Sequence, residues 1–191
     1  MNMNRLLLLL IMIGAVNVAG AQTHGIGIRL GEPSGVTYKN YFDRGKAFEF
    51  GIGTTGSGWN HNYYESSFHK HKDGNYVSHQ VDNIVYFQGR YLLNYEIPVT
   101  DVEGRFDWYW GLGAVLKFAT VHYNYTDVVP PYTFTEVRTD IDFGPEGILG
   151  AEYKFEDVPF SLFAEASVMV EFADRFGAMQ VFFGTGGRYR F

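Results

Sequence analysis

Two features are missing from this sequence, and each absence excludes a class of protein. The 191 residues contain no cysteine, which excludes disulfides, thiolate metal sites, thiol catalysis and acylation of a lipoprotein cysteine. Beyond the apolar run at residues 6–13 there is no second long hydrophobic stretch. A membrane-spanning helix needs about 20 apolar residues, so the rest of the chain would enter a membrane only as alternating strands.

The first 21 residues read as a secretory signal peptide. Arg5 supplies a positive charge, residues 6–13 form the short apolar core, and Ala19-Gly20-Ala21 is a small-residue cleavage site. We therefore expect cleavage between Ala21 and Gln22, which leaves residues 22–191 as one domain.

The composition favours strands over helices and argues against a nucleic-acid partner. The chain has 14 Tyr, 17 Phe and 23 Gly, a combination typical of strands joined by tight turns. Its formal net charge is −6 and becomes −7 once the signal peptide, with Arg5 as its only charged residue, is removed. A nucleic-acid-binding surface would be basic.

The last strand shows a two-faced pattern that recurs along the chain. In residues 181–191, Val181, Phe183, Tyr189 and Phe191 point one way, whereas Arg188 and Arg190 point the other. The same alternation predicts eight strands, at residues 24–31, 35–43, 47–54, 81–97, 106–123, 140–155, 160–172 and 181–191.

The charges of these strands gather on the face opposite the aromatic and aliphatic side chains, and their signs nearly balance. A charge facing lipid near the bilayer centre costs about 2–4 kcal/mol in a barrel, so lipid demands a neutral outer face. We therefore predict an all-β fold, an eight-stranded antiparallel up-and-down transmembrane β-barrel. The interior ionic network is expected to contain Arg29, Lys39, Glu49, Arg90, Glu96, Lys117, Glu152, Glu165, Arg188 and Arg190.

From residue 44 onward, short and long connections alternate along the chain, so the short turns would lie at one end of the barrel and the long loops at the other, as in outer-membrane barrels. The short turns at 44–46, 98–105 and 156–159 fall on one side, and the long loops at 55–79 and 124–139 on the other. Strand at the two ends of the second loop is an open alternative. Export assigns the short turns to the periplasm. An aromatic girdle is expected at the periplasmic strand ends, with Tyr91, Tyr95, Trp108, Trp110, Tyr153 and Tyr189.

Two points stay open in the sequence. Pro145 lies inside a strand and cannot donate to a ladder, so a bulge or kink is expected at Gly144-Pro145. Periodicity alone also does not say which face is inside. A soluble exported carrier, lipocalin-like, would share the strand number but hold the apolar faces inward.

Four segments resemble one family: GIGIRLGEPSGVTYKNYF, FDWYWGLGAVLKF, GPEGILGAEYKF and GTGGRYRF. They are similar to small outer-membrane β-barrel proteins of Bacteroidetes, whose architecture is that of outer-membrane protein X and of the membrane domain of outer-membrane protein A. The resemblance implies a bacterial outer-membrane location, and it implies that Phe191 is the signal read by the barrel-insertion machinery. It carries over no catalytic residue.

Candidate chemistry lies in the long loops and at the outer end of one predicted strand. His69 and His71, with His61 or His79, have the residue types of a metal site, but a solvated polar loop is the plainer interpretation. Some eight-stranded barrels are lipid A-modifying enzymes with Ser, His and an acidic partner. The residues of those types here are Ser66, Ser67, His69, Asp73 and His122. Nothing in the spacing fixes such a triad, so we expect no catalytic residue, no metal and no cofactor.

The function expected from the sequence is structural, adhesive or surface-binding, without a diffusive pore, since eight strands leave a lumen filled by side chains. Partners are the lipid of the outer membrane and a surface ligand at residues 55–79 and 124–139. These loops are rich in aromatic residues: Tyr63, Tyr64, Phe68, Tyr76, Tyr123, Tyr125, Tyr132 and Phe134.

Overall fold

The computed structural model describes residues 23–55, 64–65, 68–69, 74–100, 103–126, 132–173 and 176–191. The signal peptide predicted at residues 1–21 and its cleavage before Gln22 lie outside the described residues. Within them, no helix has both the length and the apolar character needed to cross a bilayer.

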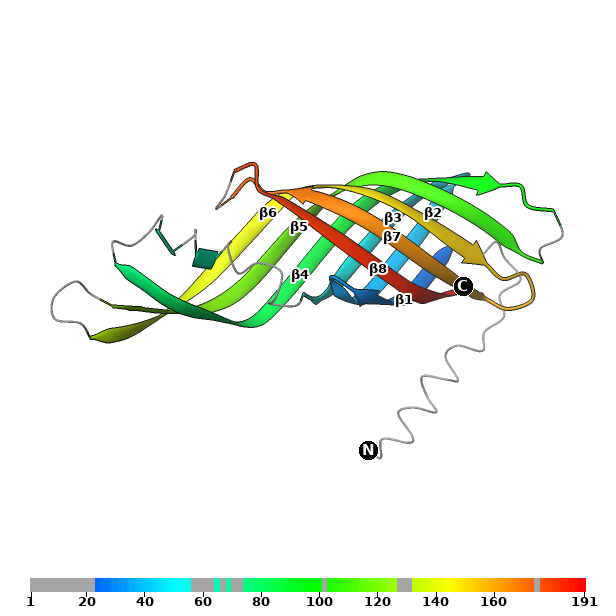
Figure 1. Ribbon diagram of the computed structural model, residues 1–191. Helices are drawn as coiled ribbons and strands as arrows, with labels where there is room; N and C mark the ends of the chain where they lie inside the picture. Colours follow the sequence, from blue (N-terminus) through cyan, green and yellow to red (C-terminus); the bar gives the residue numbers. More distant parts are fainter. Residues whose placement is uncertain are drawn as a thin grey trace, which may run out of the picture.

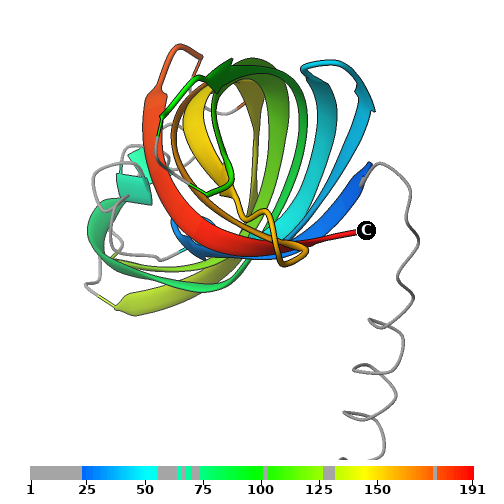
Figure 2. The same cartoon turned by 90° about the vertical axis from the view of Figure 1, so that its right-hand side faces the viewer.

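Eight antiparallel strands close into one barrel in which each strand pairs with its neighbours in sequence and β8 pairs with β1 (Figures 1 and 2). This confirms the predicted fold class. The strands are β1 His24–Gly31, β2 Ser34–Asp43, β3 Lys46–Thr54, β4 Asn75–Ile97, β5 Arg105–Thr126, β6 Thr133–Lys154, β7 Phe160–Val170 and β8 Met179–Arg190.

The two ends of the barrel differ. One end, here called the terminal end, carries Thr23, Phe191 and the described residues of the short connections, 44–45, 98–100, 103–104 and 155–159 (Figure 1). The backbone N–H of His24 donates to the carbonyl of Phe191 at 3.0 Å, so the two ends of the described chain lie side by side. The opposite end is asymmetric, because β4, β5 and β6 continue far beyond the other strands (Figure 1).

This extension is here called the projecting sheet: Asn75–Val85 of β4, Phe118–Thr126 of β5 and Thr133–Ile141 of β6. It corrects the predicted boundary of the first loop, because residues 75–79 are strand. Residues 124–126 and 133–139 are also strand, which is the alternative that the sequence left open for the ends of the second loop. Polar residues interrupt the alternation in these segments, and the local pattern therefore indicates a loop. Pairing between long neighbouring strands overrides that weak local signal.

The expected bulge at Gly144-Pro145 is absent. Pro145 pairs with Ala114 in an unbroken β5–β6 register, and the register shifts of the barrel fall elsewhere, at Tyr41/Asp43, Tyr76/Ser78 and Asp82/Val85. Phe172 N–H donates to the Phe143 carbonyl at 2.8 Å. The backbone of Phe143, and by alternation that of Pro145, therefore faces β7, whose paired register with β6 begins only at Glu146. The missing N–H of Pro145 falls just outside that ladder.

Candidate functional site

The lumen of the barrel is filled by a connected set of charged side chains, with Arg90 of β4 at its centre. Its guanidinium holds Glu146 of β6 in a bidentate pair, Nε to Oε2 at 2.9 Å and Nη2 to Oε1 at 2.7 Å. Nη1 also donates to Glu49 at 3.1 Å and to Glu165 at 2.6 Å. One arginine therefore joins carboxylates from three other strands, β3, β6 and β7.

A second group lies next to the first. Arg188 of β8 donates through Nη1 to Glu152 of β6 at 3.0 Å, and its Nη2 pairs with Glu49. Lys39 Nζ of β2 donates to Glu152 at 2.9 Å and to the side-chain oxygen of Asn94 at 3.0 Å. Glu49 thus accepts from both arginines and links the two groups.

Arg29 of β1 completes the set through Glu165, 3.2 Å from its Nη2. Four cations, Arg29, Lys39, Arg90 and Arg188, then face four carboxylates, Glu49, Glu146, Glu152 and Glu165. Their side chains are all almost inaccessible to solvent. A buried charge is tolerated only when it is paired and hydrogen-bonded, and here the signs balance. Solvent does not reach this level of the lumen.

Neutral groups complete the hydrogen bonding of these carboxylates, and they are absent from the network predicted from the sequence. The Tyr41 hydroxyl donates to Glu152 at 2.9 Å, Ser161 donates to the same carboxylate at 2.7 Å, and Tyr109 donates to Glu165 at 2.8 Å. The alternation does point Tyr41 and Tyr109 inward. A buried tyrosine hydroxyl normally needs a partner, and that signal would have found both.

The remaining residues predicted for the network lie elsewhere. Glu96 is a correction, because its side chain is 57% exposed at the terminal end, 3.3 Å from Arg105. It stands one residue from the end of β4, beyond the enclosed lumen. Arg190 is half-buried and donates to the Phe155 carbonyl at 2.8 Å. Lys117 is buried on the other side of the network and pairs with Asp142.

The outer surface of the wall is predominantly apolar. Leu112, Leu149 and Phe183 are 67%, 58% and 58% exposed, and the alternating residues of every strand follow them. A water-soluble monomer rarely exposes so large a continuous apolar surface. A bilayer provides the apolar surroundings that this surface requires, and the chain is therefore a transmembrane barrel.

The soluble-carrier alternative is excluded by the same observation. Trp110, Leu112, Leu149 and Val168 are exposed on the outside, whereas Arg90, Glu152 and Glu165 are buried in the lumen. A carrier of apolar molecules needs the opposite arrangement, with its apolar side chains around an interior cavity.

The fold is a closed barrel of eight antiparallel strands with an apolar outer wall. Similar solved structures include Ail, the attachment invasion locus protein of Yersinia pestis, at 13% identity over 88% of this chain and 93% of that chain, with a TM-score of 0.46. A major outer membrane protein from Thermus thermophilus matches at 12% identity over 88% of this chain and 99% of that chain, also with a TM-score of 0.46.

The N-terminal β-barrel domain of Pseudomonas aeruginosa OprF matches at 12% identity over 88% of this chain and 95% of that chain, with a TM-score of 0.38. No protein-family profile matches the sequence, and no curated protein matches it by sequence. The outer wall is therefore identified as lipid-facing, and the lumen as enclosed, from the exposure of their side chains in this structure.

The residues predicted for an aromatic girdle lie in the half of the barrel nearer the terminal end. Tyr95 stacks on Trp108 with ring centroids 4.9 Å apart, and Tyr189 lies edge-on to Phe160 at 5.4 Å. Tyr91 and Trp110 are exposed on the wall, and Tyr153 is half-buried. Amphipathic rings at this level suit a membrane–water interface.

The projecting sheet carries its own small core. Tyr64 and Phe68 pack against Ile84, Ala119, Val121 and Tyr123, so residues 64–65 and 68–69 cover the lumen-side face of this sheet. The Tyr64 ring lies 5.9 Å from Lys117 Nζ. Apolar packing thus continues outward from the charged lumen.

The candidate catalytic and metal residues are only partly visible. His61, Ser66, Ser67, His71 and Asp73 lie outside the described residues. His122 Nε2 is 3.3 Å from Asp82, and no serine among the described residues hydrogen-bonds to it. His69 and His79 contact aromatic rings, at 5.6 Å from Phe68 and 5.3 Å from Tyr64. In the part of the chain that the structure describes, no group of three or more possible ligands is arranged to hold a metal.

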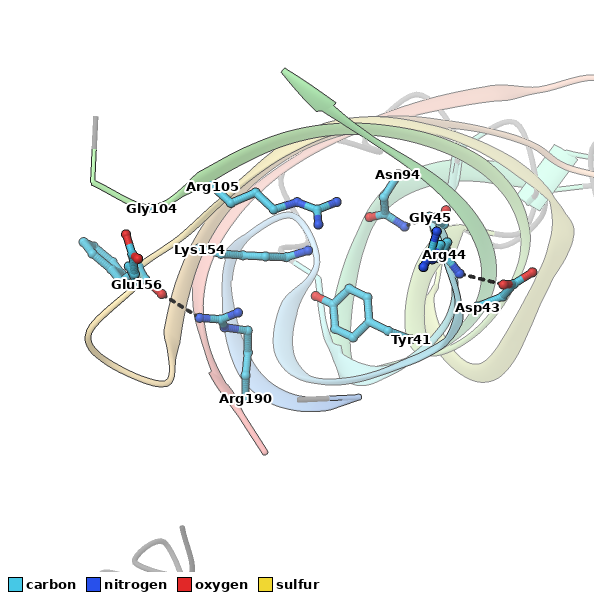
Figure 3. A pocket seen from close by; sticks show the side chains of 11 residues that line it. Tyr41, Asp43, Arg44, Gly45, Asn94, Gly104, Arg105, Lys154, Glu156 and Arg190 are labelled. Carbon is cyan, nitrogen blue, oxygen red and sulfur yellow. Dashed lines mark hydrogen bonds between the residues drawn. The ribbon is translucent and has the colours of Figure 1, made fainter. Parts of the chain in front are cut away.

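A polar cavity opens at the terminal end, here called the vestibule. Its volume is about 600 Å³. In Figure 3, Tyr41, Arg105 and Lys154 point toward its centre from β2, β5 and β6, and Arg190 of β8 lies on its wall. Asp107 lies beneath and accepts from Lys154 Nζ and from Arg105 Nε, each at 2.6 Å.

Proposed function

We propose that this protein is an integral component of the bacterial outer membrane that binds a partner at the cell surface through its projecting sheet. The proposal is supported by two features together: a lumen filled with charged side chains that exclude water, and a sheet that extends beyond the apolar wall. The lumen offers no route for solutes at the level of Arg90 and Glu146, so a transport role has no support. A barrel that only anchored in the membrane would not need this extension, so the projecting sheet is the candidate binding element.

The outer edge of β6 is the part of this sheet best suited to binding. β6 pairs with β5 along its whole length, but its ladder with β7 covers only Glu146–Lys154. No described strand pairs with the other edge of Thr133–Ile141. An open edge is a template for adding a strand from a partner, and its main-chain groups supply the affinity.

The side chains of this edge favour the same role. The backbone of Phe143 faces away from β5, so by alternation the N–H groups of Thr133, Thr135, Val137, Thr139 and Ile141 face the open edge. All five residues are β-branched, the type that fits an extended strand. Val137 is 59% exposed, and no lysine or proline blocks this segment.

The test combines location with binding. Detergent should be required to release the protein from cell envelopes, and recovery in the soluble periplasmic fraction would contradict the proposal. Binding is then measured as the retention of expressing cells on panels of immobilised matrix proteins, serum proteins and glycans.

Val137→Pro removes one N–H from the open edge without removing a β5–β6 hydrogen bond. It should reduce retention by about tenfold or more, as expected for the loss of main-chain pairing. Val137→Ala is the matched control, because it shortens the same side chain and keeps the N–H. Equal retention of both variants, with equal amounts at the surface, would reject the edge as the binding element.

Lipid A modification is the enzymatic alternative for a barrel of this size. That activity requires a nucleophile within hydrogen-bond reach of a base. The His122 imidazole has a carboxylate partner in Asp82, but no described serine lies within hydrogen-bond reach of it. A difference in lipid A acyl chains between cells with and without the protein, measured by mass spectrometry, would support the enzyme instead.

A further inference from the structure

The vestibule has the size of a small-molecule site. Its volume of about 600 Å³ lies within the range of roughly 300–1,000 Å³ that ligand pockets occupy. Its wall is made by β2, β4, β5, β6 and β8 together with the turns of the terminal end (Figure 3). Rigid strand ends, rather than a long loop, therefore position the side chains that line it.

The inner part of the vestibule has more cationic than anionic groups. Lys154 and Arg105 share one buried carboxylate, Asp107, and Glu96 reaches Arg105 only from the exposed rim at 3.3 Å. Arg190 donates to a neutral carbonyl, and its Nε has no hydrogen-bond partner among the described residues. A guanidinium without a paired carboxylate next to an open cavity is a site for an oxyanion.

The rim carries charges of both signs. Asp43, Arg44 and Glu156 line the opening, and the Asp43 carboxylate is paired with Lys46 at 2.9 Å. Glu156 is exposed. No described cation pairs with its carboxylate, which can therefore attract an ammonium group. Cations inside the cavity and this one carboxylate at the rim are complementary to a molecule that carries both carboxylates and an ammonium group.

We propose that the vestibule binds a short acidic peptide whose carboxylates meet Arg190, Arg105 and Lys154 while its ammonium group meets Glu156. The Tyr41 and Phe155 rings line the same cavity and provide apolar surface for the peptide backbone. The proposal rests on the proposed function in one respect, since the terminal end must face the periplasm to meet peptides there.

The experiment uses the full-length barrel in detergent micelles, with the dipeptide Glu-Glu as the probe and isothermal titration calorimetry at low ionic strength. Saturable binding is expected. Arg190→Gln should weaken it by about tenfold or more, the loss expected for one charge-assisted hydrogen bond. Arg105→Gln is a second variant at a half-exposed position, and Lys154 still pairs with the buried Asp107 when Arg105 is replaced. Arg138→Gln makes the same change on the projecting sheet and should bind like the wild type.

Two further probes decide the class of ligand. N-acetylated Glu-Glu lacks the ammonium group and should bind more weakly, and tripolyphosphate should bind more weakly than the dipeptide. Equal or tighter binding of either probe would overturn the assignment to a zwitterionic peptide. Absence of saturable dipeptide binding to the folded wild type, or unchanged binding in both vestibule variants, would overturn the site itself.

Failure of the vestibule proposal is distinguishable from failure of the proposed function. A barrel that stays in the outer membrane and still binds cell-surface partners, but does not bind the dipeptide, rejects only the vestibule. A protein recovered from the soluble periplasm rejects the membrane location on which both rest.

Discussion

Removal of the Arg90 guanidinium tests the central physical claim about the lumen. In Arg90→Leu, Glu49 keeps Arg188 and Glu165 keeps Arg29 and Tyr109. Glu146 is different, because both hydrogen bonds to its carboxylate come from Arg90 and its side chain is inaccessible to solvent. The substitution therefore leaves one buried carboxylate without its cation.

Breaking a buried pair by removing one partner costs about 3–5 kcal/mol. We expect Arg90→Leu to lower the free energy of unfolding by about that amount. The double variant Arg90→Leu/Glu146→Gln removes the remaining buried charge as well and should regain about 1–3 kcal/mol, the desolvation cost of an unmatched polar group.

The assay is urea unfolding of the barrel in phospholipid vesicles, followed by tryptophan fluorescence and by heat-dependent electrophoretic mobility. Arg44→Gln, at an exposed turn of the terminal end, serves as the control for loss of one positive charge. The reasoning is refuted if Arg90→Leu is as stable as this control, or if the double variant is no more stable than the single one.

Two further predictions concern the wall. Leu149→Arg places a charge on the outer face, where Leu149 is 58% exposed, and it should lower the free energy of unfolding of the vesicle-inserted barrel by about 2–4 kcal/mol. The control is Val158→Arg in the turn at 155–159, which should change the unfolding free energy little. Equal effects of the two variants on unfolding would contradict a lipid-facing wall. Gly186→Ala should destabilise by about 1–3 kcal/mol through overpacking, because an added Cβ would clash with the Ile28 carbonyl oxygen. The control is Gly147→Ala, whose added Cβ meets nothing within 4 Å and which should be neutral by the same urea assay.

The eight strands and their two faces follow from the alternation of residues, because a strand has a strict period of two. Phe106–Phe118 and Val181–Phe191 are clear examples, in which apolar outward positions alternate with inward positions that are mostly glycine or polar. The pattern is weaker where both faces are polar, and this is why it predicts loops at the ends of β4 and β6. Their strand structure depends on pairing with β5.

Pro145 illustrates a second limit of the sequence. A proline inside a strand predicts a bulge only if its missing N–H faces a paired neighbour. In this barrel the β6–β7 ladder begins one residue later, and that register is a property of the closed sheet. Local sequence does not contain it.

Alternation along the chain is enough to establish two-faced strands, with charges of both signs on one face and apolar groups on the other. Which face is enclosed became clear only from the closed barrel, since periodicity is the same for either choice. The partners of each charge also depend on closure. Arg90 pairs with Glu49, Glu146 and Glu165 because the closed sheet brings β3, β6 and β7 around it. These carboxylates are far from Arg90 in the sequence, so no local sequence pattern predicts the pairs.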